Sequence, residues 1–145
     1  MSSIFTATGE SDGHKATILI VDDETLVRWV IAEHLQACGF NVLGASSADE
    51  AIEAIRRFEG HIDIVFSDVR MPGTMDGCAL AGWVRANRPS TAVILTSGDA
   101  QAQDMARELC EHVGDIVRKP YDFDAVVARI EHTLSAARSA SQPRA

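Results

Sequence analysis

The stretch Thr17-Ile18-Leu19-Ile20-Val21-Asp22-Asp23-Glu24 decides the fold of this chain of 145 residues. It begins with a run of strand length in which Ile18 to Val21 are all apolar, so neither face of the strand is marked as polar. Strands of this kind are typical of parallel sheets that helices cover on both faces. Three acidic residues follow at once, so the stretch predicts a buried parallel strand that ends in a group of carboxylates.

Strand-like runs and helical segments alternate along the rest of the chain. The other apolar runs of strand length are Asn41 to Ala45, Ile62 to Ser67, Ala92 to Thr96 and Asp115 to Arg118. Apolar residues at helical spacing follow each run. Five strand-helix units in alternation predict an α/β fold, in which the strand-helix-strand crossovers are right-handed. We expect a doubly wound (βα)5, flavodoxin-like domain with a central five-stranded parallel sheet, for which the strand order 2-1-3-4-5 is common.

Composition excludes several classes of function. The formal net charge is −8 and the sequence pI is about 5.0, so a phosphate backbone would repel the chain and we expect no nucleic-acid partner. No apolar run approaches the roughly 18 residues that a membrane span needs, so we expect no membrane partner. The cysteines Cys38, Cys78 and Cys110 form no Cys-x-x-Cys pair. We interpret them as reduced residues in or near the core and expect a cytoplasmic protein.

The length of the chain predicts one domain with polar ends. Residues 1–15 lack the apolar stretch of a signal peptide, and we expect a flexible leader there. Residues 16–137 contain all five strand and helix units. Residues 138–145 are a short polar tail, and we expect no output domain in it.

Polar residues stand where four of the predicted strands end. Asp22 and Asp23 follow the first strand, Asp68 the third, Ser97 the fourth and Lys119 the fifth. Any one of them could cap a helix or face solvent. The carboxyl ends of parallel strands, however, meet at one crevice. The sequence therefore predicts a site with three carboxylates, a hydroxyl and an ammonium group.

Three clustered carboxylates need a counter-ion. Two unit charges about 4 Å apart repel by roughly 4 kcal/mol at an effective dielectric of 20. Mg²⁺ is suited to such a site because it binds a few carboxylates, keeps several waters and bridges to phosphate oxygens. One ionised carboxylate can then attack a phosphoryl group and form an aspartyl phosphate. Lys119 would hold a phosphoryl oxygen, and Ser97 would donate a hydrogen bond.

An ordered set of motifs, spread from Thr17 to about Leu134, resembles the CheY-like receiver domains of bacterial response regulators. The motifs are Ile18-Leu19-Ile20-Val21-Asp22-Asp23-Glu24, Asp68-Val69-Arg70-Met71-Pro72, Asp76-Gly77, Thr96-Ser97-Gly98 and Lys119-Pro120. Each motif is weak alone, and their order and spacing are specific.

The resemblance implies a role for each matching residue. Asp68 would be the phosphoacceptor. Mg²⁺ would be bound by Asp23, Asp68 and the backbone carbonyl of Arg70 directly, and by Asp22 through water. The remaining roles fall to Ser97 as the switch hydroxyl, Lys119 as the phosphate-binding cation, and Pro120 with a cis peptide bond before it.

The resemblance also implies a function and partners. The chain would be a stand-alone two-component response regulator, a signalling phosphoacceptor that is not an enzyme for a separate substrate. A histidine kinase or a histidine phosphotransfer protein would supply the phosphoryl group. The output would be a downstream target protein, a phosphate sink or a relay, between which the sequence does not choose. We expect a monomer or a weak, phosphorylation-dependent dimer.

Four positions depart from the family pattern or modify it. The loop between Pro72 and Asp76 is one residue longer than the commonest form. Arg70 and Asp99 stand two residues after the phosphoacceptor and the switch hydroxyl, where the family modulates the access of water. Ile116 occupies the place of an aromatic switch residue. Trp29 falls off the apolar face of the first helix, and we interpret Trp29 and Ile116 as a possible partner surface.

Three other functions compete with this interpretation. A haloacid dehalogenase-like phosphohydrolase would need a second acid two residues after its nucleophile, where this chain has Arg70. A flavodoxin-like cofactor binder would need a phosphate loop after the first strand, where this chain has Asp22, Asp23 and Glu24. A phosphorylation-independent interaction module would have no need for the complete set of phosphorylation residues.

Overall fold

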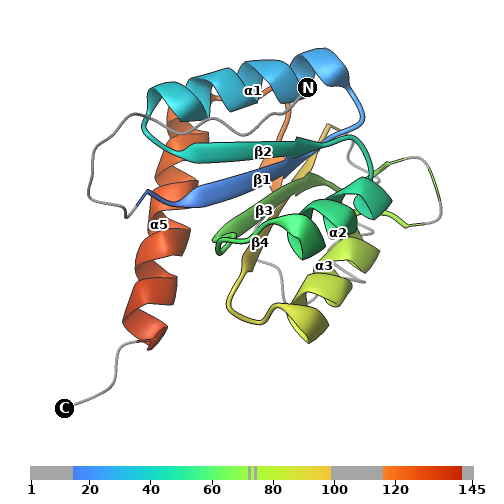
Figure 1. The fold of residues 1–145 in the computed structure, drawn as a ribbon. Coiled ribbons are helices and arrows are strands. Elements are labelled where there is room, and N and C mark those ends of the chain that lie inside the picture. The colour runs from blue at the N-terminus through green and yellow to red at the C-terminus, as the bar shows by residue number, and fades with distance from the viewer. Residues whose placement is uncertain (1–14, 72, 74, 99–115, 142–145) are drawn as a thin grey trace.

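The computed structural model describes residues 15–71, 73, 75–98 and 116–141 (Figure 1). Its elements are β1 (Thr17–Val21), α1 (Thr25–Ala37), β2 (Asn41–Ala45), α2 (Ala48–Arg57), β3 (Ile64–Asp68), α3 (Gly77–Asn87), β4 (Ala92–Ser97), β5 (Val117–Arg118) and α5 (Phe123–Ser141). The predicted fourth helix, around Met105 to Leu109, lies outside the described residues.

The five strands form one parallel sheet in the order β2-β1-β3-β4-β5, as predicted. β1 lies between β2 and β3, with Val21 opposite Ala45 on one side and Ser67 on the other. All five residues of β1 are buried. This central, doubly covered position explains the continuous apolar run from Ile18 to Val21.

Helices cover both faces of the sheet. In Figure 1, α1 and α5 lie on one side of it, and α2 and α3 lie on the other. The first side is packed by a cluster that includes Ile31, Leu35, Val126 and Ile130 from the helices. The second side is packed by a cluster that includes helix residues such as Ile52 and Leu80. The chain is therefore doubly wound, and its core has two layers.

Local signals in the sequence set the ends of three helices. Ser47 is the N-cap of α2, and its hydroxyl accepts a hydrogen bond from the Glu50 backbone at 3.1 Å. Asp122, before α5, accepts from two backbone N–H groups of the first turn. Gly39 follows Cys38, the C-cap of α1, and has a φ of 98°, a conformation that favours glycine.

Three strands are bounded differently from their predicted ranges. β5 begins at Val117, so Ile116 of the predicted run lies before it. β3 begins at Ile64 and not at Ile62. Just before it, the carboxylate of Asp63 accepts a hydrogen bond from the backbone N–H of Thr17 at 2.9 Å. β3 ends at Asp68, which pairs with Thr96 of β4. β4 also runs one residue further, to Ser97. Two of the predicted site residues therefore belong to the rigid sheet and not to the loops after it.

The cysteines do not all follow the prediction. Cys38 is free and exposed, so it is not a core residue. Cys78, in the first turn of α3, is disulfide-bonded. Cys110 lies outside the described residues. The expectation of three reduced residues in or near the core is wrong for Cys38 and Cys78. A cytoplasmic location stays a prediction.

Within the described ranges, the helices are too short or too polar for any of them to cross a membrane.

Candidate functional site

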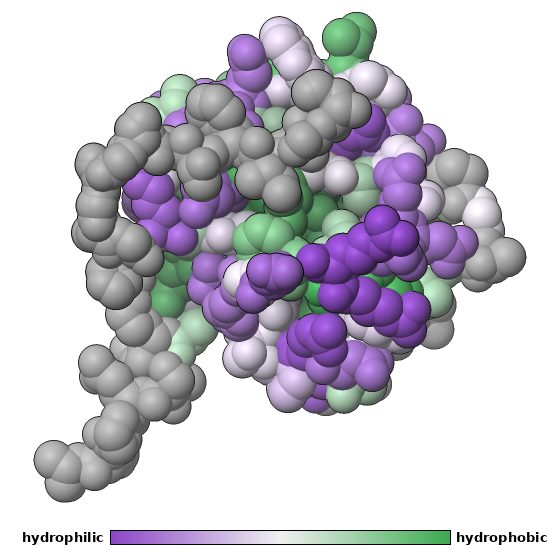
Figure 2. Space-filling model, viewed as in Figure 1, coloured by the Kyte–Doolittle hydropathy of each residue, from purple (hydrophilic) through white to green (hydrophobic). Residues whose placement is uncertain are grey.

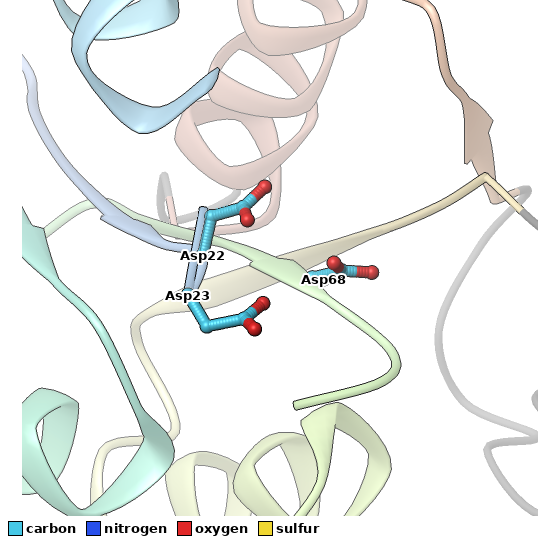
Figure 3. A group of neighbouring side chains, drawn as sticks. All are labelled: Asp22, Asp23 and Asp68. Atoms are coloured by element: carbon cyan, nitrogen blue, oxygen red, sulfur yellow. The ribbon is translucent and has the colours of Figure 1, made fainter. Parts of the chain in front are cut away.

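The site lies at the carboxyl edge of the sheet. Asp22 and Asp23 follow β1, and Asp68 is the last residue of the neighbouring β3 (Figure 3). One carboxylate oxygen from each of the three lies within 4.8 Å of the others. Three acids that are separate in sequence are thus adjacent because β1 and β3 are neighbours.

Asp22 is held from several directions. It is only 2% exposed, and its backbone N–H extends the pairing with β2 by donating to the Ala45 carbonyl at 3.1 Å. Its Oδ1 accepts a hydrogen bond from the backbone N–H of Glu24 at 2.9 Å. This turn reverses the chain into α1 and leaves Oδ2 directed at Lys119. A buried carboxylate of this kind must be paired, since an isolated buried charge is costly.

Lys119 supplies the positive charge of the site. Its Nζ lies 2.8 Å from Asp22 Oδ2, 3.1 Å from Asp68 Oδ2 and 3.6 Å from Glu24 Oε1. Burial alone would lower the pKa of this ammonium, but the hydrogen bonds to Asp22 and Asp68 outweigh burial and raise the pKa. Lys119 is therefore a permanent cation that bridges the acids of β1 and β3.

The carboxylate of Asp68 has a raised pKa. Its burial raises the pKa, and the hydrogen bond from Lys119 opposes this shift without cancelling it. A backbone hydrogen bond from Arg70 also stabilises the ionised form and acts in the opposite direction to burial. Poor solvation and ionisation together describe a carboxylate that is available as a ligand or a nucleophile.

The chain after Asp68 passes close to the start of α3. A Cβ on Gly77 would lie inside contact distance of the Asp68 carbonyl oxygen and 2.9 Å from the Cα of Val69. Gly77 is therefore required for this close approach, and its N–H donates to the Val69 carbonyl at 2.8 Å. Asp76 caps α3 by accepting from the Ala79 backbone at 2.8 Å. The motif Asp76-Gly77 thus fixes the wall of the site beside Asp68.

A cavity of about 280 Å³ opens beside these groups. Its lining residues are Asp23, Glu24, Asp68, Arg70, Ser97, Gly98 and Lys119. Carboxylate oxygens are the ligands that Mg²⁺ prefers, and the cation needs only a few of them because it keeps several waters. Asp22, Asp23 and Asp68 therefore fit a Mg²⁺ ion, and Lys119 and Ser97 are near enough to contact an anionic group beside it.

The structure brings most of the predicted residues together. Arg70 lines the cavity, and Ser97, which is 1% exposed, lines it at the end of β4. The Lys119–Pro120 peptide bond is cis, as the resemblance implied. Asp99 lies outside the described residues, and so do Pro72 and Thr74 of the longer loop.

The two predicted surface residues have different environments. Trp29 is 57% exposed on α1. Ile116 is only partly exposed, because it packs against the buried pair Val69 and Leu95. The structure thus supports an accessible surface at Trp29 more than at Ile116.

Three contacts around the site were not predicted. Arg28 donates to the Asp22 carbonyl at 2.6 Å. Tyr121 donates to Thr96 Oγ1 at 3.2 Å, and Glu24 joins the ion pairs of Lys119. Of these three contacts, only that of Glu24 had a signal in the sequence, as part of the acidic run Asp22-Asp23-Glu24. The contacts of Arg28 and Tyr121 depend on side-chain paths between separate elements.

Comparison with known proteins adds a family to this geometry. Residues 18–131 match the family model of the response regulator receiver domain. The chain is 30% identical over 125 residues to the DNA-binding transcriptional regulator NtrC of Klebsiella pneumoniae, covering 86% of this chain and 26% of that protein. It is 42% identical over 120 residues to the sensor kinase CckA of Brucella abortus, covering 82% of this chain and 12% of that protein.

A solved structure shows the same architecture. The response regulator protein TrrA of Thermotoga maritima, in complex with Mg²⁺-BeF, aligns with a TM-score of 0.71 and 28% identity, over 82% of this chain and 99% of that chain. The curated relatives first matched are longer, and the chain spans about a quarter of the length of NtrC.

Proposed function

The chain belongs to the response regulator receiver domain family, and from that premise we propose that it takes a phosphoryl group onto Asp68 in a Mg²⁺-dependent reaction. The observation that carries the proposal is the group of three carboxylates at the ends of β1 and β3, two of which, Asp22 and Asp68, are bridged by the ammonium of Lys119. Receiver domains are phosphoacceptor modules of two-component signalling, and the site has the residues that this chemistry needs.

The proposed step is an in-line transfer from a phosphohistidine. Asp68 Oδ forms a bond to phosphorus while the P–N bond to the imidazole breaks and its electron pair returns to the nitrogen. Lys119 would bind one oxygen of the transferred group, and Ser97 would donate a hydrogen bond to another. Mg²⁺, bound by Asp22, Asp23, Asp68 and the Arg70 carbonyl, would neutralise the negative charge that gathers on these oxygens.

We propose that the phosphodonor contacts α1. The large apolar side chains Leu26, Trp29 and Val30 are 74%, 57% and 42% exposed, and their spacing places them on one face of the helix. Figure 2 shows a small green protrusion at the top of the molecule, toward the right-hand end of α1, among purple and pale residues. This face begins four residues after Asp22, so a histidine kinase or histidine phosphotransfer protein that reaches Asp68 would lie against it.

Intact mass measurement tests the proposal directly. With Mg²⁺ and acetyl phosphate, the wild-type chain should gain one phosphoryl group, and Asp68→Asn should gain none. Asp63→Asn is a matched control at the opposite edge of the sheet and should behave as wild type. An adduct that persists on Asp68→Asn would assign the acceptor elsewhere, and steady turnover of many phosphomonoesters would favour a phosphohydrolase.

Phosphorylation would signal through Ser97. The phosphoryl group adds roughly −1.5 to −2 charges at the strand ends. Ser97→Ala should still accept the group but lose most of the change in amide hydrogen exchange that phosphorylation causes in wild type. Equal exchange changes in the two proteins would remove Ser97 from the switch.

A further inference from the structure

Arg28, in the first turn of α1, turns back toward the acids. Its Nη1 donates a part-buried hydrogen bond to the backbone carbonyl of Asp22 at 2.6 Å. β1 pairs with its neighbours only as far as Val21, so this carbonyl lies beyond the last pair of the sheet. Buried backbone carbonyls need a partner. A guanidinium therefore continues the hydrogen bonding at the point where the sheet ends.

The path of the Arg28 side chain crosses β2. The position of a Cβ on Gly44 would be 3.5 Å from Arg28 Cδ and 3.6 Å from Nε, so the stem lies directly over the glycine backbone. Beyond it, Glu50 of α2 has its pKa lowered mainly by hydrogen bonds from Ser46 and, to a smaller extent, by the charge of Arg28. The side chain thus links α1, the end of β1, β2 and the start of α2.

The carbonyl that Arg28 holds belongs to the peptide between Asp22 and Asp23. The orientation of this peptide decides where the Cα and the carboxylate of Asp23 stand relative to those of Asp22. The Asp22 side chain is fixed separately, by the Glu24 N–H and by Lys119. Arg28 acts instead on the backbone between the two acids.

We infer that Arg28 is a positioning residue for the metal-binding acids, which fixes the peptide between Asp22 and Asp23 so that both carboxylates point into the site. This inference rests on the proposed Mg²⁺-dependent function. It makes a prediction opposite in sign to a simple charge effect. A nearby cation repels Mg²⁺, so removal of its charge alone would tighten metal binding, whereas loss of positioning weakens it.

The test is the affinity for Mg²⁺ itself, measured by calorimetric titration of the metal-free chain. Groups that orient metal ligands typically contribute 10-fold to 100-fold to affinity, and we expect Arg28→Met to raise the Mg²⁺ dissociation constant about tenfold. Arg28→Lys, which keeps the charge and a donor on a shorter, less rigid group, should lie between Met and wild type. Arg57→Met removes the same charge from the exposed end of α2 and should leave the constant unchanged.

Gly44→Val separates positioning from folding. Valine is favoured in a strand, so β2 should form at least as well, but the branched side chain would push the Arg28 stem aside. We expect weaker Mg²⁺ binding with an unreduced melting temperature in the metal-free state. Gly44→Ala, which makes only ordinary contact with Arg28, should bind Mg²⁺ as wild type does.

Three results would overturn the inference. The first is wild-type or tighter Mg²⁺ binding by both Arg28→Met and Gly44→Val, in samples that circular dichroism shows to be folded. The second is a wild-type chain that binds no Mg²⁺, which would reject the proposed function together with the inference. Weak binding by wild type and variants alike counts against Arg28 and leaves the proposed function intact.

Discussion

Replacement of Lys119 by methionine should destabilise the metal-free protein strongly. Methionine keeps the length of the stem but removes the ammonium that lies 2.8 Å from Asp22 and 3.1 Å from Asp68. The side chains of Asp22, Asp68 and Lys119 are 3%, 12% and 15% exposed, respectively. The ion pairs are therefore largely buried, and the discount that applies to surface pairs does not apply here.

The size of the effect follows from this burial. Removal of one partner of a buried ion pair costs about 3 to 5 kcal/mol, because a buried charge is left without compensation. The site is open on the side of Glu24, which is 61% exposed, so we expect about 3 kcal/mol, the lower end of that range. For a chain of this length, such a loss lowers the melting temperature by roughly 6 to 12 °C.

Mg²⁺ should remove most of this penalty. The metal would neutralise the same carboxylates that Lys119 neutralises in its absence, so it should raise the melting temperature of Lys119→Met by more than that of wild type. The assay is a pair of thermal melts, one with a chelator and one with saturating Mg²⁺. The chain has one other lysine, Lys15, and Lys15→Met is the matched control.

Two outcomes would refute this reasoning. A melting temperature of Lys119→Met within about 2 °C of wild type in chelator would mean that the ion pairs contribute little. An equal rise on Mg²⁺ addition in both proteins would mean that the metal and Lys119 act on different groups. Asp68→Asn in the Lys119→Met background should restore part of the lost stability, because it removes one of the two orphaned charges.

Further predictions concern Asp68, Tyr121 and Gly77. Burial raises the pKa of Asp68, so protonation of Asp68 stabilises the fold at acid pH, and this stabilisation is lost as the pH rises through the folded-state pKa. Asp68→Asn should therefore raise the metal-free melting temperature at neutral pH. The gain should vanish below the ordinary aspartate pKa. Tyr121 is the chain's one tyrosine, and because burial raises its pKa to about 12, phenolate absorbance should report that value, and Tyr121→Phe should lessen the loss of stability between about pH 10 and 12. Gly77→Ala should cost about 1 to 3 kcal/mol in urea unfolding, since its Cβ meets the Val69 backbone. Gly82→Ala, in the same helix with nothing within 4 Å, should instead stabilise by about 0.5 to 1 kcal/mol, and the reasoning fails if the two changes have the same sign.

The fold and the acidic group were predictable because each depends on a local pattern. The run Ile18 to Val21 is apolar at every position, and only a strand covered on both faces accommodates that. The acids after it then fall at the carboxyl edge by the rule for doubly wound sheets. The strand order placed Asp68 beside them without any knowledge of side-chain geometry.

The contacts that hold the acids could not be predicted in the same way. Arg28 looks like any exposed helix arginine in sequence, and its reach to the Asp22 carbonyl depends on where α1 starts relative to the end of β1. Gly44 looks like a weak position in a strand, and its reason appears only when the Arg28 stem is seen above it. Such contacts join elements whose relative placement the sequence pattern does not contain.

The charges at the site explain why metal dependence should be strict. The carboxylates of Asp22, Asp23, Glu24 and Asp68 lie at or around a cavity that Arg70 and Lys119 also line. Four anions against three cations, with Arg28 counted beside Asp22, leave the site negative, and Lys119 already pairs with Asp22 and Asp68. A phosphodonor is itself an anion, so its approach to Asp68 is opposed until further positive charge arrives. In the proposed function, Asp22, Asp23 and Asp68 would hold a divalent cation that supplies this positive charge, and Lys119 would then be available to an incoming phosphoryl oxygen.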